Sequence, residues 1–242
     1  MTLLLLAGTG EAKDIAQALA AAKIDAIASL AGATRMPKPL ALPTRVGGFG
    51  GEAGFRSYVS EAGITAVLDA THPFASRITA RTLAVCTDIG LPYLQVLRPA
   101  WAPQDGDQWT EIDQEEDAAT HVLAGQTVFL GTGRQTLDRF ANLKNSRVIC
   151  RQIDPPTGPF PFPGGQFLVG RPPFPIADEI ALFRDLAIDW LVVKNAGGVR
   201  SESKLIAARQ LGIPVLMIRR PLMPETDSVA TLDDALAWVA NL

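Results

Sequence analysis

The sequence has few of the residues that build metal centres and disulfide frameworks, with two cysteines and two histidines among 242 residues. Cys86 lies in a helical pattern and Cys150 in a strand pattern, both among apolar neighbours, so we expect two buried free thiols. These residues show no zinc-type spacing, and we expect no metal. Arginine outnumbers lysine sixteen to six, which suits recognition of carboxylates or phosphates, although genome composition produces the same bias.

The sequence also lacks a long apolar run and an excess of basic residues. No apolar run approaches the ~18 residues that would span a bilayer. The first residues, MTLLLLAGTGE, carry no basic residue ahead of a short apolar run, so they predict a buried strand rather than a signal peptide, and we expect a cytoplasmic protein. A net charge of −3 argues against a general nucleic-acid binder. With 48% hydrophobic and 19% charged residues, the chain is globular.

The chain contains an internal repeat. The run LLLLAGTGEAKDIAQAL, with Gly8 and Gly10, returns 123 residues later as TVFLGTGRQTLDRFANL, with Gly131 and Gly133. The stretch IGLPYLQVLRP returns 122 residues later as LGIPVLMIRRP. Because each copy opens with a strand, Gly-x-Gly and a helix, the repeat predicts an α/β protein of two Rossmann-like domains with parallel sheets and a ligand cleft between them.

Short apolar runs alternate with segments of helical period, which is typical of parallel βαβ units. We expect an N-terminal domain over 1–100 and a C-terminal domain over 101–242, joined by a linker at 98–109, where Pro, Gly and Asp interrupt every period. In the first copy we expect strands at 3–7, 26–30, 66–69 and 93–97, and helices at 11–22, 54–62 and 75–89.

The second copy follows the same alternation except in its middle. We expect strands at 127–130, 148–151, 190–193 and 215–218, and helices at 115–123, 137–143, 177–186, 201–211 and 232–239. Eight prolines lie between Asp154 and Pro175, which excludes regular helix and favours a rigid extended loop. This loop either covers a site or is a plain surface connection.

The AGTGE motif is the first candidate for cofactor binding, with Gly8, Thr9, Gly10 and Glu11 between a strand and a helix. Glycines here let backbone amides approach an anion at the positive helix end. The third glycine of the GxGxxG fingerprint falls at Lys13, so the match is incomplete. A tight strand-to-helix turn without ligand is the alternative.

The loop after the second strand bears on which dinucleotide fits. That strand ends without an acidic residue for a ribose 2′-hydroxyl and is followed by Thr34 and Arg35, which favours NADPH over NADH. The later run RVGGFGGE predicts close approach of Gly47, Gly48, Phe49 and Gly50 to a flat or charged ligand, and we expect these four residues to contact the cofactor. A left-handed turn would explain two or three of the glycines.

The DATHPFA motif places Thr71 and His72 just beyond a strand end, where open α/β sheets bind ligands. We expect Thr71 to contact the cofactor and His72 to donate a proton or bind a carboxylate. A helix-capping loop with a satisfied imidazole is the alternative. His121 lies in a predicted helix and is expected to be solvated.

The second copy supplies candidate substrate contacts that are mostly cationic or lie beside cationic residues. Charged residues at the end of a buried strand commonly point into a cleft, although helix faces also carry ordinary solvated charge. The KNAGG motif contributes Lys194, which is also a candidate proton donor. The expected substrate contacts are Arg134, Arg171, Asn195, Gly197, Gly198, Arg200 and Lys204.

These motifs, taken in order, resemble the precorrin-6A reductase family of cobalamin biosynthesis across nearly the whole chain. The segments that carry the resemblance are AGTGE, SLAG, RVGGFGG, DATHPFA, RPxW, FLGTGRQ, RPPF, KNAGG followed by Lys204, and LGIPVLMIRRP. One departure is SLAGATR, which has Ala33 where family members often have arginine and Arg35 two residues later.

The resemblance implies NADPH-dependent reduction of a double bond, a CH-CH oxidoreduction, that converts the tetrapyrrole precorrin-6A, or its cobalt-containing analogue, to precorrin-6B. The cofactor would lie on the first copy and the carboxylate-rich macrocycle on the second. His72, Lys194 and solvent are alternative proton donors. We expect a monomer that hands its product to a neighbouring pathway enzyme, with no nucleic-acid or membrane partner.

Two other function classes have some support in the sequence. A nucleotide-sugar glycosyltransferase also uses two such domains, and Asp105-Gly106-Asp107 matches Asp-x-Asp, although it falls in the expected linker. A hinged two-domain small-molecule binding protein would close on a ligand without consuming a reductant. Short-chain dehydrogenases are excluded, because no lysine stands four residues after Tyr58 or Tyr93.

Overall fold

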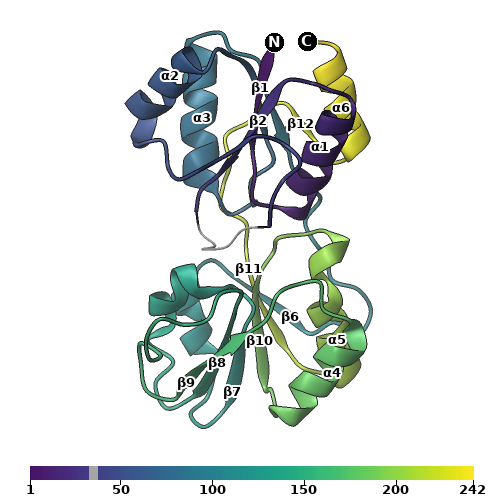
Figure 1. The fold of residues 1–242 in the computed structure, drawn as a ribbon. Helices are drawn as coiled ribbons and strands as arrows, with labels where there is room; N and C mark the ends of the chain where they lie inside the picture. Colours follow the sequence, from purple (N-terminus) through teal and green to yellow (C-terminus); the bar gives the residue numbers. More distant parts are fainter. Residues whose placement is uncertain (33–37) are drawn as a thin grey trace. The chain divides into compact units, whose positions relative to one another are not determined.

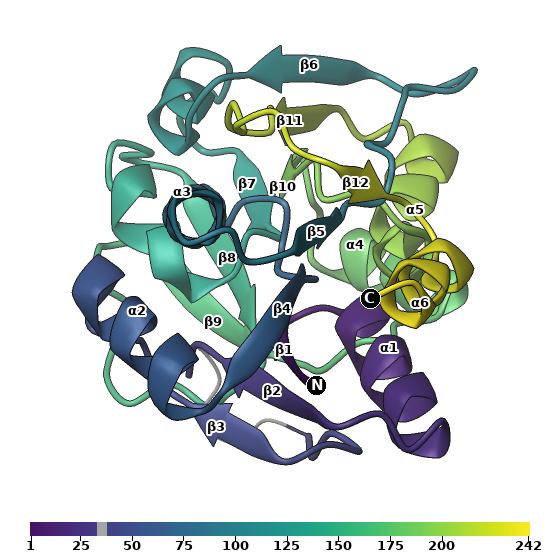
Figure 2. The same cartoon turned by 90° about the horizontal axis from the view of Figure 1, so that it is seen from above.

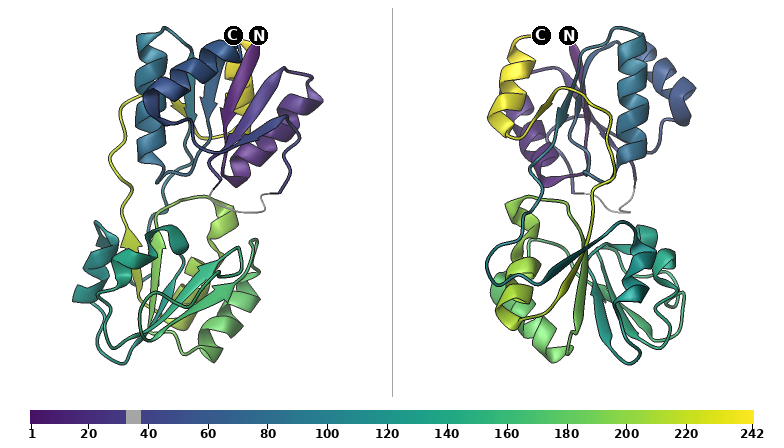
Figure 3. Two further views of the ribbon diagram at one scale, coloured as in Figure 1. Left: turned by 60° about the vertical axis from the view of Figure 1, so that its left-hand side comes forward. Right: turned by 180° about the vertical axis from the view of Figure 1, so that it is seen from behind.

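The computed structural model describes residues 1–32 and 38–242, which form two compact units. The first unit contains Met1–Pro99 and Pro221–Leu242, and the second contains Ala100–Arg220 (Figure 1). Both chain termini lie in the first unit (Figure 3). Among the described residues, no helix is long and apolar enough to cross a membrane.

The first unit is a parallel six-stranded sheet with helices on both faces. Its strands follow the order β12-β5-β4-β1-β2-β3. The bounds are β1 Thr2–Leu6, β2 Ala26–Leu30, β3 Thr44–Val46, β4 Ile64–Asp69, β5 Tyr93–Val96 and β12 Ser228–Val229. Helices α1 (Gly10–Ala21) and α6 (Leu232–Ala240) lie on one face, and α2 (Gly51–Glu61) and α3 (Ser76–Asp88) on the other (Figure 2).

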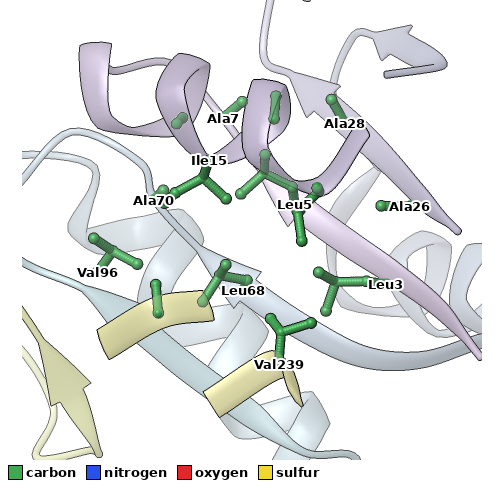
Figure 4. Packing of buried hydrophobic residues seen from close by; sticks show 14 of the residues in the cluster. Leu3, Leu5, Ala7, Ile15, Ala26, Ala28, Leu68, Ala70, Val96 and Val239 are labelled. Carbon is green, nitrogen blue, oxygen red and sulfur yellow. The ribbon is translucent and has the colours of Figure 1, made fainter. Parts of the chain in front are cut away.

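Strand β1 shows why this sheet has two apolar faces. Its four leucines, 3–6, are buried, and alternate side chains enter opposite cores. Leu3 and Leu5 pack with Ile15 of α1 and Val239 of α6, as Figure 4 shows, while the other two leucines pack with residues of α2 and α3. Burying a leucine side chain stabilises the fold by about 2 kcal/mol, so this continuous apolar run fixes β1 in the centre of the sheet.

The second unit repeats the same sheet. Its strand order is β6-β11-β10-β7-β8-β9, all parallel. The bounds are β6 Trp109–Ile112, β7 Thr127–Leu130, β8 Arg147–Gln152, β9 Gly165–Val169, β10 Trp190–Lys194 and β11 Val215–Ile218. Helices α4 (Ile176–Asp185) and α5 (Ser203–Leu211) share one core with β7, β10 and β11. The predicted class, two Rossmann-like α/β domains with parallel sheets related by a repeat, is confirmed.

One edge strand of each sheet, β12 in the first and β6 in the second, comes from the segment that follows the fifth strand of the other copy. Strand β6 follows β5 in the chain but pairs with β11, and β12 follows β11 but pairs with β5. The predicted C-terminal domain, 101–242, is therefore wrong at its end, because 221–242 belong to the first unit. Backbone bonds from Gln95 N to Asp227 O (3.1 Å) and from Leu97 N to Val229 O (2.8 Å) hold the returning segment, and α6 buries Ala235 in the first core.

Several predicted elements change type or boundary. The helices predicted at 115–123 and 137–143 are 3₁₀ helices, η1 (Glu115–Thr120) and η2 (Arg134–Phe140). The proline-rich stretch predicted as a loop contains β9, because no proline interrupts 164–171 and the backbone amides there pair with β8. The predicted linker 98–109 ends in β6, and a third 3₁₀ helix, η3 (Val199–Ser201), precedes α5.

The assignment of 221–242 to the first unit predicts the effect of a substitution in α6. Val239→Ala should lower the stability of the first unit by about 2 kcal/mol, because it leaves a cavity beside Leu3 and Leu68. Native-state hydrogen exchange should show faster exchange at the amides of β1 and unchanged exchange at those of β7. The control, Ala237→Ser, alters an exposed position of the same helix. Faster exchange confined to β7 would contradict the assignment.

Candidate active site

The first candidate site lies at the carboxyl ends of β1 and β4, which are neighbours in the sheet. Their connections leave the sheet on opposite sides, so this is the topological switch point where open α/β sheets bind ligands. The two loops are joined at Ala70, whose N–H donates to Leu6 O at 2.9 Å and whose carbonyl accepts from Thr9 Oγ1 at 2.8 Å. The glycine turn and the DATHPFA loop are therefore brought together.

The AGTGE turn forms an open N-terminus for α1. Thr9 is the N-cap and accepts from Ala12 N at 3.1 Å. Gly8 has φ +144°, and a Cβ added there would meet no atom within 4 Å, so space remains above the turn. With Gly10 starting a helix of 12 residues, the free amides can face an anion. Glu11 is neutralised by Arg98, with 2.7 Å between carboxylate and guanidinium, which removes its repulsion of an anion; its contact with a cofactor stays a prediction.

The glycine-rich loop joins β3 to α2 and is shaped by Arg45. The guanidinium donates to the carbonyls of Gly47 (2.9 Å) and Gly48 (3.0 Å). Gly50, in the left-handed region at φ +78°, is the N-cap of α2. A Cβ on Gly54 would lie 1.8 Å from Phe49 O, so this glycine permits the close turn.

Phe49 is buried in the structure, although the sequence predicted that it contacts a ligand. Its ring packs against Phe55 at 5.0 Å and Tyr58 at 5.2 Å between ring centroids, and it belongs to the core of α2 and α3. The predicted contacts of Gly47, Gly48, Phe49 and Gly50 with a cofactor remain predictions. The predicted contacts of Thr34 and Arg35 lie outside the described residues.

Asp69, which the motif analysis did not single out, organises the loop after β4. Its carboxylate is fully buried and accepts hydrogen bonds from Thr71 N (3.0 Å), Thr79 Oγ1 (2.8 Å) and Tyr93 Oη (2.9 Å). Burial, together with this carboxylate, raises the pKa of Tyr93 and raises that of Cys86 to about 12. Sequence shows an acid at the strand end, but only the fold reveals that three donors converge on it.

His72 is held with a defined tautomer. Its Nδ1 accepts from Phe74 N at 3.2 Å, and its carbonyl accepts from Ala75 N at 2.7 Å. Because Nδ1 is an acceptor, the neutral ring carries its proton on Nε2. Half-buried beside Thr71 at the end of β4, His72 has the chemistry of a proton donor, and that role stays a prediction. His121 lies at the end of η1 and is half-buried against Trp190, with ring centroids 6.3 Å apart.

The second candidate site lies at the equivalent ends of β7 and β10, also neighbours. A Cβ on Gly131 would lie 3.0 Å from Val193 and 3.3 Å from Lys204, so this glycine makes room for the lysine stem rather than for a ligand. Lys204 lies 5.6 Å from the Trp101 ring and donates to Ser201 O. Burial lowers the pKa of Lys204 to about 8, although Glu179 acts in the opposite direction.

Lys194 is held by a buried carboxylate. Its Nζ lies 3.2 Å from Glu115 and 3.3 Å from Thr136 Oγ1, while Arg139 approaches the same carboxylate at 2.7 Å. The ammonium is thus fixed at the end of β10 by η1 and η2. The glycine turn of this unit continues into Arg134, which is exposed.

The KNAGG loop anchors both segments that connect the two units. The Asn195 amide accepts from Trp101 N (2.8 Å) and donates to Trp101 O (3.0 Å). Trp101 Nε1 donates to Gly198 O at 3.2 Å, and Arg220 donates to the carbonyls of Asn195 (2.8 Å) and Ala196 (3.0 Å). The side chain of Asn195 is therefore committed to holding Trp101, a structural role that the sequence did not indicate.

The remaining predicted contacts lie on loops around this site. Arg171 and Arg200 are exposed, and Gly197 and Gly198 have φ of +68° and +82°. Sequence reasoning missed the buried pair of Arg151 and Glu179, whose two hydrogen bonds are both 2.6 Å. These findings leave the predicted substrate contacts untested.

The lowered pKa of Lys204 predicts its titration. The NMR signal of its Cε, assigned by its loss in Lys204→Met, should titrate with a midpoint of about 8. Because the unfolded chain holds this proton up to about pH 10.5, the folded state gains stability relative to Lys204→Met as pH rises from 8 to 10.5. A midpoint at the ordinary lysine value would contradict this environment.

Comparison with known proteins shows the family. The family model described as precorrin-6x reductase CbiJ/CobK matches residues 2–240. The precorrin-6A reductase of Rhodobacter capsulatus is 41% identical over 240 residues, covering 99% of this chain and 96% of its own length. That of Rhodococcus erythropolis is 44% identical over 243 residues, covering 99% and 98%.

The more distant relatives and a solved structure agree with this match. The cobalt-precorrin-6A reductase of Priestia megaterium is 25% identical over 252 residues, covering 99% of this chain and 98% of its own length. A solved structure titled CobK precorrin-6A reductase has a TM-score of 0.95 at 40% identity, covering 100% of this chain and 96% of that one. The chain belongs to the precorrin-6x reductase family.

Proposed function

We propose that this reductase uses NADPH to reduce one double bond of precorrin-6A and gives precorrin-6B in cobalamin biosynthesis. The observation that carries the proposal is the match to precorrin-6A reductases at 41% and 44% identity over nearly the whole chain. The relatives named for the cobalt-containing substrate are 25% identical, which favours the cobalt-free macrocycle. We place the reaction in the cytoplasm and infer a monomer that passes its product to a neighbouring pathway enzyme.

The first unit fits a dinucleotide cofactor. The open space at Gly8 and the free amides at the start of α1 suit a pyrophosphate. Gly10, Thr71 and the glycine-rich loop would complete the contacts. When bound, NADPH supplies the hydride. The chain's own residues hold the cofactor, orient it and provide the proton.

The second unit is the proposed site for the macrocycle. Its candidate cations suit the many carboxylates of a tetrapyrrole, since charge-assisted hydrogen bonds to carboxylates are strong. Lys194 and Lys204 stand at the end of β10 and on α5, fixed by Glu115 and Trp101. Arg134, exposed at the start of η2, is free to reach outward. Arg171, Arg200, Gly197 and Gly198 are the other proposed contacts.

His72 and Lys194 are the two proposed proton donors from the chain. The Nδ1 of His72 accepts from Phe74 N, so the ring donates a proton only as the imidazolium, in which Nδ1 is protonated and this hydrogen bond is released. Lys194 Nζ is held by the buried carboxylate of Glu115 at 3.2 Å.

The structure does not favour the glycosyltransferase alternative, because one acid of its Asp-x-Asp motif is already paired. Asp107 of the Asp-x-Asp sequence is buried and forms two hydrogen bonds with Arg209, at 2.9 and 3.0 Å. A carboxylate used in this way is not available to bind a metal-nucleotide.

The choice of cofactor is tested by the reductants that support turnover. With precorrin-6A present, the purified protein should oxidise NADPH at least tenfold more efficiently than NADH, because the end of β2 carries no acid for a free ribose 2′-hydroxyl. Absorbance at the nicotinamide band gives kcat/KM for each. Equal efficiency, or oxidation of neither, would contradict the proposal.

The role of His72 is tested by its alanine variant. His72→Ala should lower kcat about 100-fold, the usual worth of a general acid, and change the Kd for NADPH less than twofold. Binding is measured by nicotinamide fluorescence and turnover by product formation. Wild-type turnover in this variant would assign the proton to Lys194 or to solvent, and loss of NADPH affinity alone would make His72 a binding residue.

A further inference from the structure

Arg81 is a half-buried cation in the first unit for which the proposed chemistry gives no role. It lies on α3, and its guanidinium carbon is 5.6 Å from the ring centroids of both Phe49 and Phe55. Its Nε and Nη2 are shielded from solvent and have no hydrogen-bond partner among the described residues. Buried donors without acceptors are rare in native proteins, because leaving them unpaired costs free energy. The unpaired donors of Arg81 therefore favour binding of an anion.

The neighbourhood of Arg81 holds a second cation, and no carboxylate of the described residues pairs with either one. Arg45 lies on the same ring, with 4.0 Å from its guanidinium carbon to the Phe49 centroid. It donates to Ser29 Oγ and to two loop carbonyls, all uncharged acceptors. The acid nearest in sequence to Arg45 is Glu52, and the acid nearest to Arg81 is Asp88. Both carboxylates pair with Arg56. Within the described part of the chain, neither Arg45 nor Arg81 forms an ion pair.

Arg45 lies where the adenosine half of a dinucleotide binds in a sheet of this strand order, and Arg81 lies near the same Phe49 ring. Arg45 stands on β3 and bonds to Ser29 on β2, close to the carboxyl ends of both strands. In such sheets the ribose 2′-position lies near the end of the second strand, where an arginine takes the place of an acid when the ribose is phosphorylated. Strand β2 ends without an acid, so this surface attracts the phosphorylated ribose.

We propose that Arg81, supported by Arg45, recognises the 2′-phosphate of NADPH. The inference rests on the proposed function, which names NADPH as hydride donor. The planar guanidinium presents two adjacent N–H donors that suit a phosphate in bidentate geometry. Phe49, which packs against this group, belongs to the glycine-rich loop.

Desolvation agrees with this assignment. Burial lowers the pKa of Arg81 from its ordinary value, yet the guanidinium stays charged at neutral pH. A dianionic phosphate would restore the lost solvation.

The test compares two adenosine probes that differ only in the 2′-phosphate. Binding of 2′,5′-ADP and 5′-AMP to the full-length protein is measured by calorimetry for wild type, Arg81→Gln and Arg77→Gln. Arg77 is the matched control, because it is an exposed arginine one turn earlier on α3. Arg81→Gln should weaken 2′,5′-ADP at least tenfold and change 5′-AMP less than twofold, and Arg77→Gln should change neither.

Each other outcome overturns the proposal. Equal weakening of both probes by Arg81→Gln would show that Arg81 supports the adenine site or the fold, and no weakening would show that it contacts neither. If Arg81→Gln does not fold, Arg81→Lys provides the test. Lysine keeps the positive charge but lacks the two adjacent N–H donors of the guanidinium, so this variant should bind 2′,5′-ADP threefold to tenfold more weakly and bind 5′-AMP with unchanged affinity. Wild-type affinity in that variant overturns the proposal. If wild type binds 5′-AMP as tightly as 2′,5′-ADP, the NADPH assignment itself fails.

Discussion

The pairing of β1 with β4, and of β7 with β10, is the constraint on which both candidate sites depend. In the first unit the register sets Leu6 opposite Asp69, so the glycine turn and the DATHPFA loop leave the sheet side by side. The hydrogen bond from Thr9 to the Ala70 carbonyl then fixes one loop to the other. Because β1 is buried on both faces, neither loop can shift without disturbing two hydrophobic cores. The second unit builds its site on the same pairing.

The two copies differ in charge at the end of the third strand in the order of each sheet, β4 in the first unit and β10 in the second. Strand β4 ends in Asp69, a buried carboxylate satisfied by three donors. Strand β10 ends in Lys194, an ammonium held by Glu115. The same architecture thus ends in a buried, hydrogen-bonded carboxylate in one unit and in an ammonium in the other. This contrast supports the proposed division of labour between cofactor and macrocycle, since fold alone would not separate the two roles.

The sequence predicted most of the fold, because buried parallel strands leave continuous apolar runs such as those of β1 and β7. It did not predict β12, whose two residues carry no pattern, nor the return of 221–242 to the first unit. The glycine turns and loop motifs were located from spacing alone. What spacing cannot show is which side chains are already occupied: Asn195 holds Trp101, and Glu11 pairs with Arg98. Arg81 lies in no recognised motif. Its two donors without hydrogen-bond partners become evident only in the folded structure, where α2 and α3 pack together.

The central claim is that the first unit binds the nicotinamide cofactor and the second binds the tetrapyrrole. Hydrogen exchange measured by mass spectrometry, with NADP⁺ alone and with precorrin-6A alone, tests it most directly. NADP⁺ should protect peptides that cover 7–12, 47–51 and 70–75, and precorrin-6A should protect those that cover 131–136 and 194–204. Protection of the second set by NADP⁺, with the first set unchanged, would contradict the account.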